Sequence, residues 1–332
     1  MTFDYFNRMK ENILGIDVGG TKCAVIYGNR DGSDLHILDK NKFPTTSLED
    51  TIHNIVASID NIMRKHTLSK DQIAAVGISC GGPLDSNEGV IMSPPNLQGW
   101  DNVPIVKIIE DKYGIKTGLQ NDANACALAE WKYGSGRGVR NMVFMTFGTG
   151  LGAGLILDGK LYTGANDNAG ELGHIRLSDH GPVGYGKSGS FEGFCSGGGI
   201  TQIAKMLLLE KMQMGISVAW CKPEEMELIT AQKVAEEAVK GDELALRIFD
   251  ISAEALGKGL SVVIDILNPE AIVIGGIYTR CQELMEGRML EIIRKEALPN
   301  SRQVCKVLTS RLGEQIGDYA ALSVAANLLN RG

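Results

Sequence analysis

The sequence has no long apolar run, few prolines and no closely spaced pair of cysteines. No apolar stretch reaches the roughly 18 to 20 residues of a membrane-spanning helix, and the opening segment MTFDYFNRMKEN lacks the apolar centre of a secretory signal. The 7 cysteines are scattered and form no C-x-x-C motif, which is typical of thiols that stay reduced. We therefore expect a soluble, cytoplasmic protein that does not interact with a membrane.

Neither sign of charge dominates the chain. Lysine and arginine together number 33 against 40 acidic residues, a net charge of −7, so we expect no nucleic-acid partner. The length of 332 residues suits two compact lobes.

Glycine is abundant, with 41 glycines against 9 prolines. The glycines cluster in a way that indicates tight backbone turns, at 15–20, 77–82, 148–154, 181–199 and 275–276.

One pattern of strand, glycine-rich turn and strand occurs twice. Apolar runs at 13–18 and 22–27 flank Gly19-Gly20-Thr21, which predicts a β-hairpin. The runs at 141–147 and 153–162 flank GTGLG, and the second of them carries its own Asp-Gly turn. We interpret the recurrence as a weak internal repeat, with one copy in each lobe.

The segments between these hairpins predict helices and buried strands. The run 45–66 has apolar residues on one helical face, and Ser47 with Asp50 resembles a capping box. Gly134 is expected to end the helix that follows Asn121-Asp122. The remaining expected elements are strands at 73–79 and 271–276, helices at 104–113 and 315–330, and a mostly helical stretch at 201–266.

Two turns can bind phosphate. Asp17-Val18-Gly19-Gly20-Thr21-Lys22 presents backbone N–H groups, a hydroxyl and an ammonium group, which together form an anion cradle. Asp17 could hold a water molecule on Mg²⁺. Gly148-Thr149-Gly150 has the same chemistry in the second copy. The alternative is a plain hairpin turn with exposed charges.

Two further glycine motifs match known nucleotide-binding patterns, but the segments around them do not fit those patterns. GTGLGA at 148–153 fits a dinucleotide fingerprint but leads into a hairpin and not a helix. GPVGYGKS at 181–188 fits a P-loop, which needs a buried strand before it and a helix after it. The segment 189–199, GSFEGFCSGGG, is too rich in glycine for us to expect a helix there. The apolar run VVID at 262–265 lies inside a helical pattern. Lys187 and Ser188 are therefore interpreted as incidental.

Five motifs in sequence order resemble those of the ROK sugar kinases, a family named for repressors, open reading frames and kinases and related to actin, hexokinase and the heat-shock ATPases. They are LGIDVGGTK, QNDANACALAE, GTGLGAG, ELGHIRL and LNPEAIVIGG. The resemblance implies an α/β fold of two RNase-H-like lobes around a central cleft. It places 1–120 with the helix 315–332 in a small lobe and 121–314 in a large one. It also implies a homodimer, ATP with Mg²⁺, and phosphorylation of a hexose hydroxyl.

The resemblance assigns Asp122 as the catalytic base, a carboxylate that accepts the proton of the attacking hydroxyl. The alternative is that Asn121 or Asp122 simply caps the following helix. Asn96, Asn121 and Glu171 correspond to positions that bind sugar hydroxyls, for which amide and carboxylate groups are suited. Glu130 on the same helix is expected to be a solvated surface residue.

The other residues that the resemblance assigns lie on the two glycine-rich turns, in the glycine pair at 275–276 and in the motif E-L-G-H at 171–174. His174 is implied to contact the sugar, with a satisfied core histidine as the alternative. Gly275 and Gly276 are implied to pack against adenosine, with a plain strand-to-helix turn as the alternative. The predicted phosphate-binding residues are Gly19, Gly20, Thr21, Lys22, Gly148, Thr149 and Gly150.

The chain departs from the family at its zinc motif. The pattern C-x-C-G-x-x-G-C-x-E aligns with residues 183–192, where Val183, Tyr185 and Ser190 replace the three cysteines. A structural zinc site needs four N or S ligands, and His174 with Cys195 cannot supply them. We predict no zinc, and expect Tyr185 and local packing to hold the loop and Glu192 to contact the sugar.

The sequence thus predicts an ATP-dependent hexose kinase, with glucose as the leading substrate. N-acetylmannosamine, allose, fructose and a β-glucoside are alternatives. A sugar-sensing repressor would carry a helix-turn-helix domain before the first phosphate turn, where only about a dozen residues stand here. A sugar-binding protein without activity is disfavoured because Asp122, Lys22 and Glu192 are all present.

Overall fold

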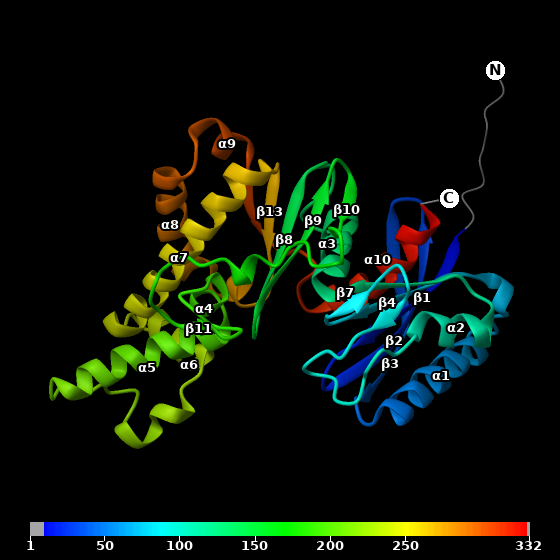
Figure 1. The fold of residues 1–332 in the computed structure, drawn as a ribbon, viewed down its shortest axis with the longest axis horizontal. Coiled ribbons are helices and arrows are strands. Elements are labelled where there is room, and N and C mark those ends of the chain that lie inside the picture. The colour runs from blue at the N-terminus through cyan, green and yellow to red at the C-terminus, as the bar shows by residue number, and fades with distance from the viewer. Residues whose placement is uncertain (1–9, 331–332) are drawn as a thin grey trace. The chain divides into compact units, whose positions relative to one another are not determined.

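The computed structural model describes residues 10–330, which divide into two compact units (Figure 1). Unit 1 contains the chain up to Gly138, then Lys160–Ala169, and the chain from Arg311 onward. Unit 2 contains Val139–Gly159 and Gly170–Ser310. The predicted division before residue 121 differs from this one, in which the helix after Asn121 belongs to unit 1.

Unit 1 is built on a five-stranded mixed sheet, and its first hairpin is the predicted one. The strands are β1 (Glu11–Val18), β2 (Lys22–Asp31), β3 (Asp34–Pro44), β4 (Ile73–Cys80) and β7 (Thr117–Asn121), in the order β3-β2-β1-β4-β7. β1 pairs antiparallel with β2 and parallel with β4, and β7 is parallel to β4. A separate two-stranded ribbon consists of β5 (Leu84–Asp85) and β6 (Val90–Ile91). The strand β3 was not predicted.

Helices cover both faces of this sheet (Figure 1). They are α1 (Leu48–Lys65), α2 (Ile105–Tyr113), α3 (Asp122–Tyr133) and α10 (Ile316–Leu329), with short 3₁₀ turns at Lys70–Gln72 and Gly313–Gln315. Because side chains alternate along a strand, Leu14 and Ile16 pack with α1 and α2, whereas Ile13 packs with α10. Ser47 accepts the N–H of Asp50 and so caps α1, as predicted.

The helix α10 lies unusually close to the sheet because the strands beneath it carry glycine. A Cβ atom on Gly77 of β4 would overlap the backbone of Ala321, and one on Gly15 of β1 would lie 2.9 Å from the Ala321 Cβ. Ala321, Leu322 and Ala325 complete the apolar cluster on this face. The glycines of this face therefore leave room for α10 to pack closely on the sheet.

Unit 2 repeats the strand connectivity of unit 1. Its strands are β8 (Met142–Phe147), β9 (Leu151–Leu157), β13 (Ala271–Ile274) and β14 (Lys306–Thr309), in the order β9-β8-β13-β14. β8 pairs antiparallel with β9 and parallel with β13, just as β1 pairs with β2 and β4. The predicted repeat is thus present in the backbone pairing. After the turn at Asp158-Gly159, β10 (Lys160–Tyr162) follows.

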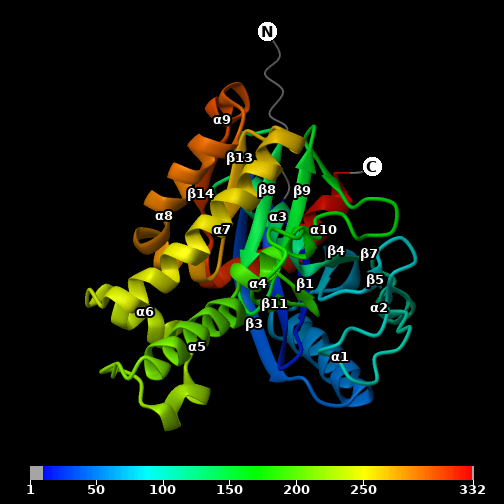
Figure 2. The same ribbon diagram turned by 60° about the vertical axis from the view of Figure 1, so that its left-hand side comes forward.

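Helices make up most of the rest of unit 2, and several lie side by side in Figure 2. They are α4 (Phe191–Phe194), α5 (Gly197–Gln213), α6 (Ala231–Val239), α7 (Glu243–Leu267), α8 (Ile277–Glu296) and α9 (Pro299–Val304), with 3₁₀ turns at Leu172–His174 and Pro223–Leu228. The run 262–265 lies inside α7, as predicted. No helix within residues 10–330 is long and apolar enough to cross a membrane.

The expectation that 189–199 contains no helix was wrong. α4 lies within this segment, and α5 begins at Gly197. Ser196 caps α5 by accepting the N–H of Gly199, and a Cβ atom on Gly199 would overlap the backbone of Gly193. Packing against α4 therefore requires glycine in the first turn of α5, and this requirement outweighs the low helix propensity of glycine.

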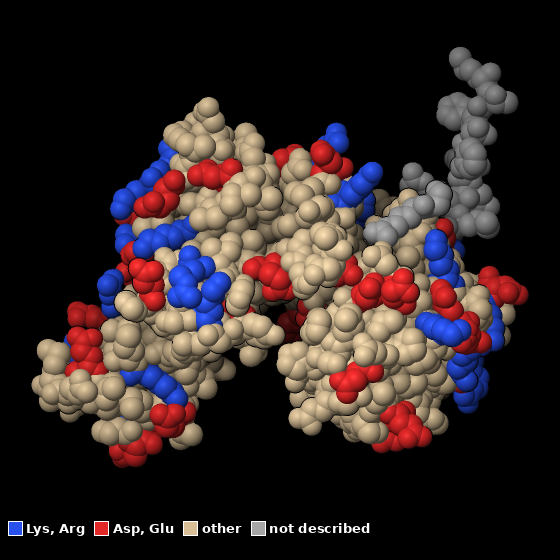
Figure 3. All heavy atoms as spheres, in the orientation of Figure 1, with Lys and Arg blue, Asp and Glu red and all other residues tan. Residues whose placement is uncertain are grey.

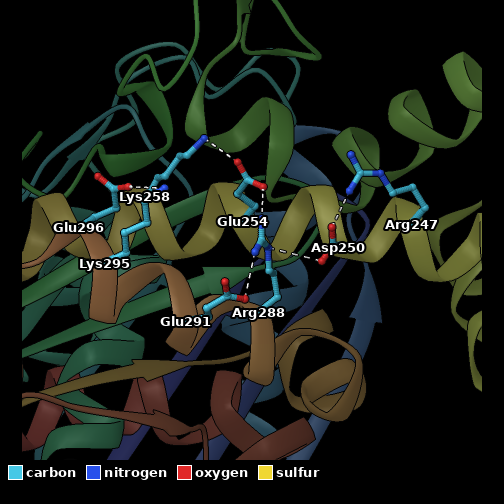
Figure 4. A network of polar contacts seen from close by, with 8 residues as sticks. All are labelled: Arg247, Asp250, Glu254, Lys258, Arg288, Glu291, Lys295 and Glu296. Atoms are coloured by element: carbon cyan, nitrogen blue, oxygen red, sulfur yellow. Dashed lines mark hydrogen bonds and ion pairs between the residues drawn. The ribbon is translucent and has the colours of Figure 1, made fainter.

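A network of charged side chains joins α7 to α8 (Figure 4). The Arg288 guanidinium of α8 lies 2.6 Å from Glu254 and 3.5 Å from Asp250, both on α7. Hydrogen bonds from Lys258 and then Arg288 lower the pKa of Glu254 to about 2. On the face drawn in Figure 3, basic and acidic side chains are interspersed, as the modest net charge suggests.

Candidate functional site

The predicted phosphate turn of unit 1 is held by a hydrogen bond within the turn and by two hydrogen bonds from Thr45. The Gly19 N–H donates to the Lys22 carbonyl at 3.2 Å, and a Cβ atom on Gly19 would lie 2.7 Å from that oxygen. Thr45, just beyond β3, donates its hydroxyl to the Gly19 carbonyl at 2.6 Å and its N–H to the Thr21 carbonyl at 3.0 Å. Thr21 and Lys22 remain exposed. Sequence analysis missed Thr45, because β3 was not predicted.

The structure brings Asn96 and Asn121 to the same edge of unit 1 as this turn. A Cβ atom on Gly20 would lie 2.8 Å from the Asn96 carbonyl oxygen, and one on Gly81 would lie 3.7 Å from the Asn96 amide. A Cβ atom on Gly82 would lie 3.3 Å from Nδ2 of Asn121. The three glycines therefore leave room for two amide side chains, which can bind hydroxyl groups as donors and as acceptors.

At the N-terminus of α3, a capping role and a catalytic role of Asn121 and Asp122 are compatible. Asn121 is the N-cap and accepts the Ala123 N–H at 2.9 Å. Asp122 is the first residue of α3, and its Oδ1 shares the same N–H at 2.7 Å. Its carboxylate is accessible to solvent, yet the protein crowded around it raises the pKa of Asp122, while the backbone hydrogen bonds oppose that shift. Asn121 and Asp122 thus share the capping contact, and Asp122 is an exposed residue whose carboxylate has a raised pKa.

Asp17 lies among other carboxylates in unit 1. Burial, followed by repulsion from Asp318, raises the pKa of Asp17 to about 6, with Asp122 adding to the shift and Lys40 opposing it. Lys40 forms an ion pair with Asp318 in the first turn of α10. A Cβ atom on Gly317 would lie 3.2 Å from Oδ2 of Asp17. A cation here would stabilise the ionised form of Asp17, so the donor chemistry fits a metal ion or its hydration shell. Sequence analysis did not identify Lys40 or Asp318.

The prediction that Glu130 is a solvated surface residue was wrong, because its exposed fraction is 0%. Its carboxylate accepts the N–H of Ser135 at 2.8 Å and the N–H of Leu312 at 3.0 Å, with that of Arg311 at 3.4 Å. A Cβ atom on Gly134 would overlap this carboxylate, which explains why glycine ends α3. Glu130 thus joins the end of α3 to the point where the chain re-enters unit 1.

The second predicted phosphate turn lies at the end of β8 in unit 2. The Gly148 N–H donates to the Gly150 carbonyl at 3.0 Å, and the Gly148 carbonyl accepts the Gly197 N–H at 2.8 Å. The N-terminus of α5 is therefore attached to the turn. Glu192 reaches the turn too, because its Oε2 accepts the Leu151 N–H at 2.9 Å. A Cβ atom on Gly150 would lie 2.7 Å from that oxygen.

The glycine pair after β13 lies beside this turn. Gly276, the N-cap of α8, has a φ of +72°, and a Cβ atom there would overlap the Phe147 carbonyl and lie 3.5 Å from the Gly148 nitrogen. A Cβ atom on Gly275 would lie 3.3 Å from the Phe144 ring. The pair forms a strand-to-helix turn and adjoins the predicted phosphate turn.

Glu171 is the N-cap of a 3₁₀ turn that ends at His174 and adjoins Glu192. Both side chains are exposed, so His174 is not a core histidine. A Cβ atom on Gly173 would lie 3.3 Å from the Glu192 Cβ. The His174 ring lies edge-on to that of Tyr185, with 6.1 Å between ring centroids. Within unit 2 the structure thus places Glu171, His174 and Glu192 around one region next to the phosphate turn.

The segment 181–188 is a hairpin and not a P-loop. Strands β11 (Val183–Gly184) and β12 (Lys187–Ser188) are joined through Tyr185 and Gly186, both with positive φ. No buried strand precedes the hairpin and no helix begins at its Gly-Lys-Ser, so rejection of the P-loop is confirmed.

The side chains in this loop do not match zinc chemistry. Val183, Tyr185 and Ser190 offer no thiolate or imidazole group. Cys195 is buried, its thiol lies 3.4 Å from the Ser252 carbonyl, and burial raises its pKa. Across residues 10–330, no three or more histidine, cysteine, aspartate and glutamate side chains are grouped to hold a metal ion. The zinc implied by the resemblance therefore does not fit this donor set.

Two α/β units with the same strand connectivity, each with a glycine-rich turn after its first long strand, define the fold of the actin and hexokinase ATPases. A solved structure of similar fold is the ROK family glucokinase from Streptomyces griseus in complex with glucose and AMPPNP. It has a TM-score of 0.74 and 28% sequence identity, and the match covers 95% of this chain and 99% of that one. The predicted fold class is confirmed.

The family follows from the sequence matches. The ROK family model matches residues 13–327, and the chain belongs to the ROK family. It is 31% identical to a glucokinase from Thermotoga maritima, over 95% of this chain and 97% of the relative. It is 33% identical to an N-acetylmannosamine kinase from Citrobacter koseri, over 79% of this chain and 82% of the relative.

Proposed function

We propose that this protein is an ATP-dependent sugar kinase that transfers the γ-phosphoryl group to a hexose hydroxyl, with glucose as the leading substrate. The observation that carries the proposal is the accessible Asp122 carboxylate, whose pKa is raised at the N-terminus of α3. Asn96 lies against Gly20 of the Gly19–Lys22 turn, and Asn121 lies against Gly82 in the same unit. The similarity to glucokinases supports the choice of glucose.

In this mechanism Asp122 accepts the proton of the attacking hydroxyl as the phosphoryl group is transferred. Its raised pKa makes it a better base than an ordinary carboxylate near neutral pH. The amides of Asn96 and Asn121 orient sugar hydroxyls, and Glu171, His174 and Glu192 are further proposed sugar contacts. Transfer without a covalent enzyme intermediate needs only positioning and charge stabilisation.

The two glycine-rich turns bind the phosphates of ATP through backbone N–H groups. Thr21, Lys22 and Thr149 add hydroxyl and ammonium donors, and Gly275 and Gly276 allow adenosine to approach the backbone. Mg²⁺ would neutralise charge on the phosphates, and Asp17 would hold one of its water molecules. We further propose a homodimer that works in the cytoplasm.

The test is an ADP-release assay with glucose, mannose, fructose, allose, a β-glucoside and N-acetylmannosamine. We expect turnover with one or more of these sugars, and ³¹P NMR of the product would identify the phosphorylated hydroxyl. Asp122→Asn should lower kcat by at least about 10³-fold while sugar binding, measured by calorimetry, persists. Asp111→Asn, at an exposed position of α2, is the control. Turnover by Asp122→Asn at the wild-type rate would exclude Asp122 as the base.

The similarity to an N-acetylmannosamine kinase supports a second candidate substrate. The same assay distinguishes the two, because kcat/KM ranks glucose against N-acetylmannosamine directly. A preference for the amino sugar would retain the reaction and change the substrate. Absence of ADP release with every sugar, in a folded protein that binds ATP, would overturn the kinase proposal.

A further inference from the structure

We propose that Lys187 fixes the position of the turn at 171–174 in unit 2, which carries two of the proposed sugar contacts. In this chain, which lacks the donors of a zinc site, Lys187 would hold the loop in place of a metal ion. The inference rests on the proposed sugar kinase function, because its consequence is expressed in sugar affinity. Lys187 is the residue that made 181–188 look like a P-loop, and the phosphate-binding turns described above do not include it.

The ammonium group of Lys187 donates a hydrogen bond to the backbone carbonyl of His174 at 2.7 Å. The contact joins β12 of the hairpin to the 3₁₀ turn Leu172–His174. The Lys187 side chain is half-buried although it is long and charged. A hydrogen bond from a charged donor is stronger than one between neutral groups, so this contact can fix the position of the turn.

A second cation makes the reciprocal connection. Arg176, two residues after His174, donates from Nη1 to the Ser188 carbonyl at 2.8 Å. Ser188 in turn donates its hydroxyl to the Gly181 carbonyl at 3.0 Å. Neighbouring residues of β12 thus bond to His174 and to Arg176, one as donor and one as acceptor. Two such bonds restrict rotation as well as separation.

The hairpin is itself fixed on its other strand, so it can serve as a support. Gln202 of α5 accepts the Val183 N–H and donates to the Val183 carbonyl, both at 2.9 Å. Ser190, which is fully buried, caps α4 by accepting the Gly193 N–H at 3.1 Å. Ser190 also donates its hydroxyl to the Gly184 carbonyl at 3.4 Å, so the hairpin is attached to α5 and to the cap of α4, and Lys187 bonds this hairpin to His174.

The same hairpin adjoins Glu192. A Cβ atom on Gly184 would lie 2.8 Å from the Glu192 Cβ. Lys187 bonds to the turn and not to Glu192, so loss of its bond should displace Glu171 and His174, while the Leu151 N–H still holds Glu192. Lys187 is a positioning residue, because it acts through these side chains and the proposal gives it no contact with the substrate.

The expected result follows from this arrangement. Lys187→Met keeps the length of the side chain and removes its charge and donors. We expect the KM for the sugar to rise about tenfold, as for loss of one charge-assisted hydrogen bond. The KM for ATP should stay within about twofold, because the Gly148–Gly150 turn is held by Gly197 and Glu192. Lys187→Arg, which retains a charged donor, should restore most of the sugar affinity.

The matched control is Lys205→Met, which breaks an ion pair with exposed Glu227 elsewhere in unit 2 and should leave both KM values unchanged. Hydrogen exchange of the ligand-free protein supplies a readout that does not depend on activity. Lys187→Met should accelerate exchange of the amides in 174–176 and 183–190, and Lys205→Met should not. This measurement remains informative if no sugar is phosphorylated, so failure of the proposed function and failure of the inference are separate outcomes.

Three results would overturn the inference. One is wild-type sugar KM and wild-type hydrogen exchange in Lys187→Met. Another is an equal rise in both KM values with a lowered Tm, which indicates a general loss of structure. The third is inactivation of the wild-type protein by a zinc-selective chelator at constant Mg²⁺, with activity restored by added zinc, because it would show that a metal ion holds the loop.

Discussion

The carboxylate of Glu192 accepts a hydrogen bond, 2.9 Å long, from the backbone N–H of Leu151. One side chain that we propose to contact the sugar therefore also holds the turn that we propose to bind phosphate. Both residues belong to unit 2, and the bond joins the N-terminal turn of α4 to the start of β9.

Replacement of Glu192 should therefore affect both substrates, in contrast to replacement of Lys187. Glu192→Ala removes the acceptor for Leu151, and we expect the KM values for sugar and for ATP each to rise at least about fivefold. Glu192→Gln keeps an acceptor oxygen and should raise mainly the sugar KM. Steady-state kinetics with each substrate varied in turn checks the difference. An ATP KM that stays at the wild-type value in Glu192→Ala would show that the turn does not depend on this bond.

A methyl group on Gly20 should disturb the candidate site of unit 1. The added Cβ would lie 2.8 Å from the Asn96 carbonyl and 2.9 Å from its Cβ, so the turn or Asn96 must shift. We expect Gly20→Ala to lower kcat/KM by at least about tenfold with only a small change in Tm. Gly287→Ala is the matched control, because nothing lies near its added Cβ in α8. That change should leave kinetics unaltered and stabilise the helix by about 0.5 to 1 kcal/mol. Equal kinetics in the two variants would contradict the predicted crowding at Gly20.

Loss of the Glu130 carboxylate should destabilise the protein strongly. Glu130→Ala leaves the N–H groups of Ser135 and Leu312 without their acceptor in a buried place. We expect a cost of about 3 kcal/mol, measured by denaturant unfolding. Glu236→Ala, at an exposed position of α6, should change stability by less than about 0.5 kcal/mol. A cost as small as that of the control would mean that water replaces the carboxylate.

The raised pKa of Asp17 predicts a dependence of stability on pH. The value is about 6 in the folded protein against the ordinary value of 3.8, with burial as the largest cause. Between these values the native state holds a proton that the unfolded state has released, so this group makes stability fall as pH rises from about 4 to about 6.

Asp17→Asn removes the charge and should raise Tm at pH 7.5 by about 3 °C. It should also reduce the decline in Tm between pH 4 and pH 6, and lower activity sharply if Asp17 orients a water molecule on Mg²⁺. Thermal unfolding across this pH range, beside the exposed variant Asp111→Asn, gives the comparison. A lower Tm in Asp17→Asn at pH 7.5 would show that the ionised carboxylate stabilises the fold.

Local sequence patterns predicted the elements whose formation depends on neighbouring residues. Apolar alternation with Gly19-Gly20 predicted the β1–β2 hairpin, and the Ser47 cap with its apolar face predicted α1. The repeat was recognisable because both copies use the same turn chemistry. These features require only short-range information, and the structure contains them.

Contacts between distant segments explain what was missed. Glu130 has the sequence context of an exposed helical glutamate, and it is buried because the chain returns to it 181 and 182 residues later. Thr45 and Lys187 acquire their contacts only when β3 and the hairpin at 181–188 are in place. The glycines at 197–199 predicted that no helix begins there. α5 does begin there, because the close approach of α4 requires glycine in the first turn of α5.

The close fit of α10 on Gly15 and Gly77 has a consequence for biosynthesis. The sheet of unit 1 is translated early, whereas α10 begins at Ile316 and leaves the ribosome after the whole of unit 2. All strands and helices of unit 2 can form before that, since its chain ends at Ser310. The apolar face around Ile13 and Ala75 therefore stays uncovered while unit 2 is made, and exposed apolar surface of this kind attracts chaperones and favours aggregation. A chain truncated after residue 310 should be protease-resistant in unit 2 and sensitive in unit 1.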